Sequence, residues 1–167
     1  LIAGQCIEAV GSPGEFASIE ADARVVDATG KAVLPGLIDC HVHLFLAGNS
    51  DPRKTFAADT LQMKILRAAG NAQTQLRAGV TTVRELGGPE DVVFSVRDGI
   101  KEGVINGCRI LTAGLCITHA ADRSNMQYGG GAEDEAQVRE ATRGRLEAGA
   151  DVIKIMADGG GQYTAAE

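Results

Sequence analysis

Two periodicities of apolar residues divide this chain into short elements. Apolar, β-branched runs predict strands, and segments with an apolar residue at every third or fourth position predict helices. The strands are expected over residues 32–44, 80–86, 108–113 and 151–157, and the helices over 56–78, 89–103 and 133–147. Residues 1–31 are expected to form short strands with turns, and a long loop is expected over 114–132.

The predicted helices and strands alternate, and this order predicts a parallel α/β sheet. Ala78-Gly79 and Ala148-Gly149 repeat the same step from the end of a helix into a strand. An open, doubly wound sheet and a closed barrel both fit this order. The open sheet usually has a glycine-rich phosphate-binding turn after its first strand, and no such turn follows His43. The pattern therefore favours a barrel.

The end of the first predicted strand carries two histidines. Side chains alternate between the faces of a strand, so Asp39, His41 and His43 share one face. Neutral imidazole is a common metal ligand, and two histidines at this spacing can bind one ion from a single strand. Asp39 could orient a ligand imidazole or make an ordinary strand-end hydrogen bond. The pair could alternatively be two solvated or core histidines.

Three other residues are candidates because of their place in the predicted strands. Lys154 lies between isoleucines in the last strand. A buried ammonium needs a charged partner or must lose its charge, so Lys154 is either paired with a carboxylate or is a neutral, reactive amine. Arg84 and Glu85 end the second strand, on the side where barrel active sites form. They either surround the site or form a structural ion pair.

The stretch LPGLIDCHVHL at 34–44 closely resembles the first barrel strand of the metal-dependent amidohydrolase superfamily. The similarity extends to DATGK at 27–31, AGVTTVR at 78–84 and DVIKIM at 151–156. These stretches are most similar to the imidazolonepropionase-like branch, which includes dipeptidases and carboxypeptidases acting on Xaa-Pro or Xaa-Arg/Lys bonds. The resemblance implies an α/β fold: the N-terminal half of a (β/α)8 TIM barrel over 33–167, preceded by strands of a small β-sandwich over 1–32.

The resemblance also implies a metal chemistry. His41 and His43 would bind metal, and Lys154 matches a lysine that reacts with carbon dioxide in binuclear members of the superfamily. The resulting carbamate would bridge two divalent ions, with zinc expected, so Lys154 would be both a metal ligand and a catalytic residue. Related peptidases carry a glycine-rich, histidine-containing segment after the third strand. His119 lies there without neighbouring glycines, and contact with substrate is one interpretation of it.

The length of the chain does not fit a complete barrel. Four βα units are half of such a barrel, which typically needs about 250 residues, whereas the chain has 167 residues. We therefore expect a fragment that is inactive alone and whose partner is the missing C-terminal half. The resemblance implies that the remaining metal ligands, two histidines and an aspartate that shuttles protons, lie beyond Glu167.

Composition narrows the class of protein. The chain has 22 acidic against 16 basic residues and 4% aromatic residues, which argues against binding to nucleic acid. No run approaches about 18 consecutive apolar residues, so no membrane span is predicted. The 4 cysteines form no CxxC pair, which favours reduced thiols in a cytoplasmic protein over disulfides.

These observations predict a cytoplasmic, homo-oligomeric hydrolase of amide bonds. We expect a dipeptidase or carboxypeptidase that uses a metal-bridging hydroxide on a small-molecule or dipeptide substrate. Two alternatives stay open: a cyclic-amide hydrolase similar to hydantoinases or dihydroorotases, and an inactive scaffold of the same fold. The presence of His41, His43 and Lys154 together argues against the scaffold.

Overall fold

The computed structural model describes residues 1–16, 23–120 and 129–157. The chain divides into two compact units, Leu1–Pro35 and Gly36–Glu167. This division lies close to the predicted domain boundary after residue 32. Among the described residues, no helix has both the length and the apolar character needed to cross a lipid bilayer.

The first unit contains one hairpin in its described part. β1 (Ile2–Ala3) pairs antiparallel with β2 (Cys6–Ile7), and a short 3-10 helix, η1, spans Pro13–Phe16. The α-amino group of Leu1 donates a hydrogen bond to the carbonyl of Ala9 at 2.8 Å, which ties the two ends of the hairpin together. The assignment of these short strands to a small β-sandwich stays a prediction.

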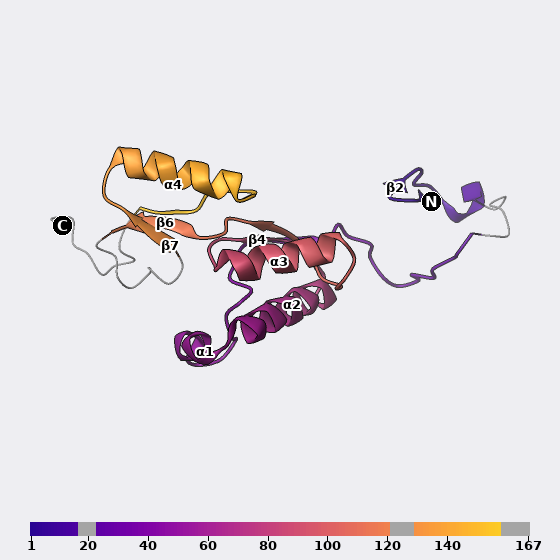
Figure 1. The fold of residues 1–167 in the computed structure, drawn as a ribbon. Helices are drawn as coiled ribbons and strands as arrows, with labels where there is room; N and C mark the ends of the chain where they lie inside the picture. The colour runs from indigo at the N-terminus through magenta and orange to yellow at the C-terminus, as the bar shows by residue number, and fades with distance from the viewer. Residues whose placement is uncertain (17–22, 121–128, 158–167) are drawn as a thin grey trace. The chain divides into compact units, whose positions relative to one another are not determined.

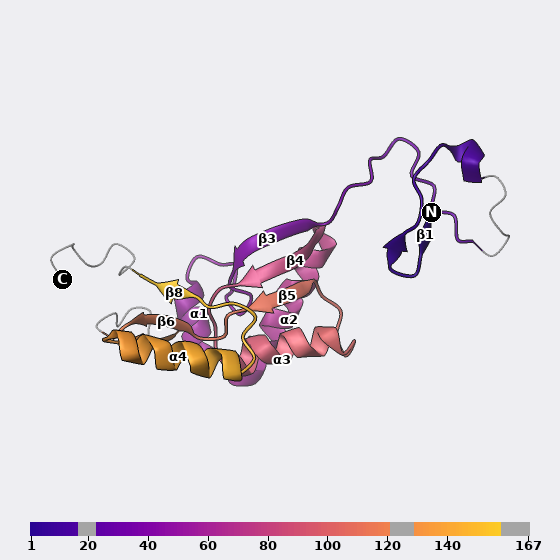
Figure 2. The ribbon, with the colours of Figure 1, turned by 90° about the horizontal axis from the view of Figure 1, so that it is seen from above.

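Three parallel strands form the first sheet of the second unit, in the order β3-β4-β5 (Figure 2). They span Leu37–Val42, Val80–Glu85 and Arg109–Thr112. Both pairings are parallel, which confirms the predicted α/β class. β3 begins later than the sequence predicts. Pro35 has no N–H to donate to a ladder, and the Leu37 N–H makes the first bond toward the neighbouring segment.

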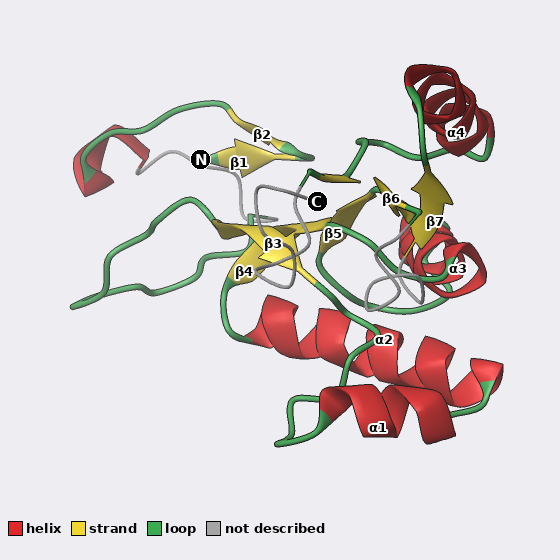
Figure 3. Ribbon diagram, turned by 90° about the vertical axis from the view of Figure 1, so that its left-hand side faces the viewer, coloured by secondary structure: helices red, strands yellow, loops and turns green. Residues whose placement is uncertain are grey.

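Two helices rather than one precede β4 (Figure 3). α1 spans Pro52–Ala58 and α2 spans Leu61–Arg77, where the sequence predicts a single helix. The break falls at Asp59, whose backbone is extended. Thr60 then caps α2, because its hydroxyl accepts a hydrogen bond from the Met63 N–H at 3.3 Å.

The hydrophobic core lies between this sheet and helices α2 and α3 (Glu90–Lys101), which run along the same side of it (Figure 1). Val83 and Ile110 from the strands and Val96 from α3 have exposed fractions of 0%, 5% and 1%. Burying a side chain of this size stabilises the fold by roughly 1.5–3 kcal/mol. Arg84, next to Val83 in β4, is exposed, so the strand alternates between a buried and an open face.

A second sheet contains three short parallel strands in the order β7-β6-β8. β6 spans Cys116–His119, β7 spans Gly129–Ala132 and β8 spans Ile155–Met156. The prediction of a long loop over 114–132 is therefore wrong, because β6 and β7 lie within this range. A Cβ added at Gly129 would collide with the Cys116 carbonyl, so this strand needs glycine to approach β6 closely.

The fourth helix, α4 (Glu135–Glu147), packs beside β6 and β7 (Figure 1). The Asp134 carboxylate caps it by accepting a hydrogen bond from the Gln137 N–H at 2.8 Å. None of the residues in α4 is buried. The chain then leads to β8, which is two residues long where the sequence predicts a strand over 151–157.

Candidate metal centre

The two histidines of the first strand lie side by side at its C-terminal end. Val42 is the last residue of β3, and His41 and His43 flank it. Their ring centroids are 5.4 Å apart, and the rings meet edge to face at 70°. His41 is exposed, and the His43 side chain is 34% exposed. The structure therefore brings the two imidazoles together on the open side of the strand end.

The orientation of His43 is set by a main-chain carbonyl. Its Nδ1 lies 2.9 Å from the carbonyl oxygen of Gly87. A carbonyl can only accept, so Nδ1 must carry the proton, and the lone pair of the neutral ring is then on Nε2. A histidine whose other nitrogen donates to a carbonyl is the usual arrangement of a metal ligand. His43 thus has its Nε2 prepared to bind a cation.

A buried carboxyl group supports the same ring. Glu85 is 0% exposed, and its Oε1 lies 3.4 Å from His43 Nδ1. The single Nδ1 proton points to the nearer Gly87 carbonyl, so in the described part of the chain Oε1 has no hydrogen-bond partner. Oε2 accepts from the Thr112 hydroxyl at 3.1 Å and from the Gly87 N–H at 3.4 Å. A buried carboxylate oxygen of this kind favours the binding of a cation by the neighbouring imidazole.

The charges around His41 favour its neutral form. Partial burial of the ring is the largest cause that lowers the pKa of His41, although the residue as a whole is exposed. The charges of Lys154, His43 and Arg84 lower this pKa further, while Asp39 raises it. Neutral imidazole is the form that binds metal. The surroundings therefore keep His41 available as a ligand at neutral pH.

Lys154 reaches this region from the second sheet. It lies immediately before β8, and its carbonyl accepts a hydrogen bond from the Ile117 N–H of β6 at 2.8 Å. Its charge is the second-largest cause of the lowered pKa of His41, so its ammonium lies within electrostatic range of that ring. Lys154 is half-buried, whereas the sequence predicts a strand buried on both faces. Among the described residues, β8 has a strand neighbour on one side, β6.

The other predicted site residues are placed on different faces. Arg84 and Glu85 are neighbours in β4 and so point in opposite directions: Glu85 lies beside His43, while Arg84 Nε donates to the Cys40 carbonyl at 2.8 Å. Asp39 accepts a hydrogen bond from the His41 N–H at 3.0 Å, which is the strand-end contact considered above.

His119 ends β6, in the second sheet, and is exposed. Its register partner is Ala132, and the strand beside it contributes Gly129, Gly130 and Gly131. The glycines that are missing around His119 in the sequence are therefore supplied in space by β7. The sequence contains this signal in the glycine run itself, but only the strand pairing relates it to His119.

The donor set fits a divalent ion in a particular way. Within residues 1–16, 23–120 and 129–157, no three His, Cys, Asp or Glu side chains form a group that could hold a metal. His41 and His43 supply two nitrogen donors, and a lysine near them supplies an oxygen donor only after it has been converted to an anion. The residues present therefore fit a metal if Lys154 is modified.

The sequence and the fold of this chain are similar to those of known proteins. Residues 32–167 match the Amidohydrolase family. The imidazolonepropionase of Geobacillus kaustophilus (strain HTA426) is 40% identical over 77 residues, which are 43% of this chain and 18% of that protein. A crystal structure of an amidohydrolase matches with a TM-score of 0.71 and 33% identity, over 84% of this chain and 38% of that one. A Xaa-Pro dipeptidase with bound methionine in the active site matches with a TM-score of 0.62 and 33% identity, over 75% and 34%.

This chain spans well under half the length of each of these relatives. The structural matches confirm the predicted barrel class, and the described strands and helices cover a part of that fold.

Proposed function

Because this chain belongs to the Amidohydrolase family, we propose that the whole protein is a metal-dependent hydrolase of amide bonds. The family match confirms the resemblance carried by residues 34–44. The activity itself is our proposal, since the chain covers only part of its relatives. One observation carries it: His41 and His43 lie 5.4 Å apart, and His43 is held with Nδ1 on the Gly87 carbonyl.

Each residue of the site has a role in this proposal. His41 and His43 hold divalent ions, and zinc suits these nitrogen donors. Glu85 lies beside His43 Nδ1, where its negative charge helps to hold the ring and favours the binding of a cation by it. When bound, the ions supply Lewis-acid polarisation of the substrate carbonyl and an acidified water.

Lys154 supplies the anionic oxygen that the histidines lack. As a neutral amine, it adds to the carbon of carbon dioxide, forms an N–C bond and releases a proton, which leaves a carbamate anion. That anion could bridge two ions, so we propose a binuclear centre. Support comes from the charge of Lys154, which contributes to the lowered pKa of His41, and from the hydrogen bond that fixes the Lys154 backbone on β6.

The substrate that we favour is a dipeptide. Support comes from the Xaa-Pro dipeptidase, which matches 75% of this chain at 33% identity. A carboxypeptidase acting on Xaa-Arg or Xaa-Lys bonds is a variant of the same proposal. The second candidate is a cyclic amide, and the 40% identity with an imidazolonepropionase over 77 residues favours it.

The test uses the whole protein with zinc and bicarbonate. We expect about two equivalents of metal, and hydrolysis of Xaa-Pro or Xaa-Arg/Lys dipeptides in preference to cyclic amides. His41→Asn and His43→Asn should lose metal and activity together. A protein that binds metal but cleaves only cyclic amides would support the second candidate. A protein that binds no metal and cleaves neither class would contradict the proposal and favour the inactive scaffold.

A further inference from the structure

The segment that carries Lys154 is tied to the first sheet at its start. The Asp151 N–H donates to the Thr112 carbonyl at 2.8 Å, and Asp151 Oδ2 accepts from the Thr112 N–H at 3.0 Å. The side chain of Asp151 thus completes a two-bond pairing with the last residue of β5. At its other end, the segment is tied to β6, because the Lys154 carbonyl accepts from the Ile117 N–H.

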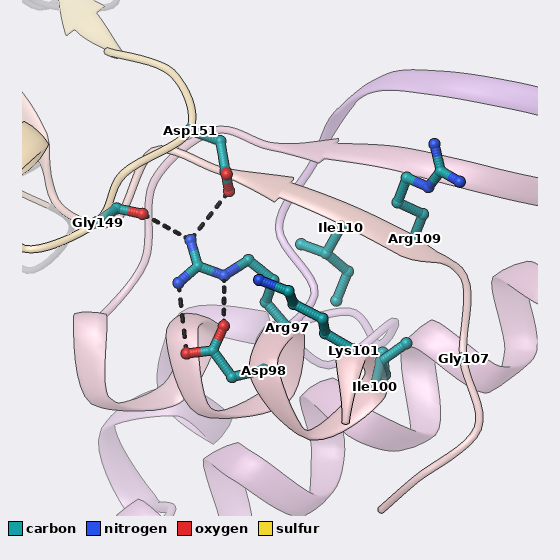
Figure 4. Close-up of a pocket in the computed structure, with 9 residues that line it drawn as sticks. All are labelled: Arg97, Asp98, Ile100, Lys101, Gly107, Arg109, Ile110, Gly149 and Asp151. Atoms are coloured by element: carbon teal, nitrogen blue, oxygen red, sulfur yellow. Dashed lines mark hydrogen bonds and ion pairs between the residues drawn. The ribbon is translucent and has the colours of Figure 1, made fainter. Parts of the chain in front are cut away.

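Arg97 of α3 hydrogen-bonds to Asp151, the residue that pairs with Thr112 (Figure 4). Its Nη1 donates to Asp151 Oδ2 at 3.0 Å and to the Gly149 carbonyl at 2.6 Å. Its Nε donates to Asp98 Oδ1 at 2.8 Å, and the guanidinium lies 4.8 Å from the centre of the Phe94 ring. The Arg97 side chain is only 17% exposed, so these charge-assisted bonds are strong and geometrically specific.

The two elements on either side of this segment, α4 and β8, provide little apolar packing to hold it. α4, which precedes the segment, has no buried residue, and β8, which follows it, is two residues long with Ile155 53% exposed. The backbone between Gly149 and Lys154 is therefore positioned by hydrogen bonds from α3, β5 and β6. Arg97 supplies two of those bonds from a single group.

We propose that Arg97 is a positioning residue for the metal centre: it fixes Gly149 and Asp151, and through them it sets where Lys154 lies relative to the histidine pair. The inference rests on the proposed function, since it gives Lys154 a role at the metal. In this proposal, Arg97 contacts neither the metal-binding side chains nor the reacting atoms. It acts through the three-residue step from Asp151 to Lys154.

The test compares Arg97→Met and Arg97→Lys with a matched control in the whole protein. Methionine keeps an unbranched stem over Phe94 and removes every donor, and Arg97 lines a cavity of about 670 Å³ that gives the replacement room. Lysine keeps the charge but cannot reach three acceptors at once. The control is Arg67→Met, which removes a similarly enclosed ion pair: Arg67 bonds Asp59 Oδ2 at 2.9 and 2.7 Å and is 25% exposed.

The first measurement is hydrogen exchange in the metal-free protein, followed by mass spectrometry. Arg97→Met should speed exchange in the peptides that contain Asp151 and Ile117 about tenfold or more, because hydrogen bonds to a charged group are lost. Arg97→Lys should fall between Arg97→Met and the unchanged protein. Arg67→Met should leave both peptides as they are. Unchanged exchange in Arg97→Met would overturn the claim that Arg97 holds the segment.

The second measurement is the affinity for the second equivalent of zinc in the presence of bicarbonate. Arg97→Met should weaken it by about 10–100-fold, the usual effect of losing a residue that orients a ligand, while Arg67→Met should not. Faster exchange with unchanged affinity would overturn the role at the metal. If the unsubstituted protein binds only one zinc, the proposed binuclear function fails, and with it the role at the metal. The exchange data would still decide whether Arg97 positions Lys154.

Discussion

The two three-stranded sheets of the second unit are built differently, although each carries part of the candidate centre. β3-β4-β5 is backed by α2 and α3, with Val83, Val96 and Ile110 buried between them. β7-β6-β8 is accompanied by α4, none of whose residues is buried. The first sheet is positioned by packing of apolar side chains. The segment between α4 and β8 is positioned by hydrogen bonds and an ion pair that reach Asp151 from the first sheet and its helix.

The residues of the candidate centre are therefore held in place in two different ways. His41 and His43 belong to the well-packed sheet, and a main-chain carbonyl fixes the ring of His43. Lys154 directly precedes β8, a two-residue strand of the other sheet, and hydrogen bonds fix the backbone of its segment. We infer that the histidines form a site for one ion that is prepared in advance. In the proposed binuclear centre, the site for a second ion would depend on the modification and positioning of Lys154.

The largest expected effect tests whether the chemistry needs both sheets. Lys154→Ala should leave one ion on the histidines, lose or weaken the second, and lower amide hydrolysis by several orders of magnitude. Lys154→Arg should not restore it, since guanidinium stays protonated and cannot form a carbamate. Lys154→Glu should restore part of it, because a carboxylate can also bridge. Elemental analysis and amide hydrolysis of the whole protein measure these outcomes.

A structural ion pair at Lys154 predicts another pattern. Lys154→Arg would then be tolerated, metal content would be unchanged, and the melting temperature rather than turnover would fall. Normal activity and normal metal content in Lys154→Ala would end the carbamate hypothesis.

The next largest effect concerns stability and compares one helix from each sheet. Val96→Ala in α3 should lower the free energy of unfolding by about 2–3 kcal/mol, from lost burial plus a cavity. Val138→Ala in α4 should lower it by less than about 1 kcal/mol, because Val138 is only half-buried. The helix-propensity change is the same in both variants. Denaturant unfolding of the whole protein measures the pair, and equal losses would break the contrast between the two sheets.

A smaller effect is expected at Glu85, the buried residue beside the His43 ring. Glu85→Gln keeps the shape of the buried side chain and should weaken zinc binding about tenfold, since it removes the negative charge beside the His43 ring. Glu90→Gln is the matched control: Glu90 also has a buried Oε1 without a hydrogen-bond partner among the described residues, but it lies near Arg145. Competition with a zinc chelator measures both affinities. Equal losses would assign the effect to charge in general rather than to His43.

The smallest effect concerns the solvent-facing part of the Arg97 network. The Asp98 side chain is 49% exposed, and its hydrogen bond from Arg97 lowers the pKa of Asp98 below 3.8. A lowered carboxyl pKa stabilises the fold above the unfolded value, and this stabilisation is lost as the pH falls through the folded value. Asp98→Asn should therefore lower the free energy of unfolding at pH 7 by no more than about 1 kcal/mol.

Urea unfolding at pH 7 and at pH 3 measures this difference between Asp98→Asn and the unchanged protein. The difference should shrink at the lower pH. A difference that grows with acidity would contradict the sign of the pKa shift.

Short-range patterns in the sequence predicted much of the first sheet. The alternation of faces around His41 and His43 needs no distant contact, so the shared face could be predicted. The same alternation separates Arg84 from Glu85, but only the pairing of the strands shows that Glu85 is the one beside His43. The Asp59-Thr60 step, a helix cap, was the available signal for the break between α1 and α2.

Long-range contacts in the second sheet could not be predicted. β7 is a glycine-rich strand, and glycine by itself indicates a loop. Its pairing with β6 depends on a close approach to Cys116 that no local pattern encodes. Arg97 resembles any charged residue on a helix, and its partners Gly149 and Asp151 lie more than fifty residues away.

The Gly87 carbonyl has a consequence for how this site can change through mutation. The acceptor that fixes the His43 ring belongs to the main chain, so no single codon change removes it directly. Gly87 has a φ of +128°, a conformation that side chains rarely adopt, so the bond would be lost by replacing the glycine rather than by removing an oxygen. The tautomer of His43 thus depends on the backbone conformation of the turn at Gly87 and not on a side-chain acceptor.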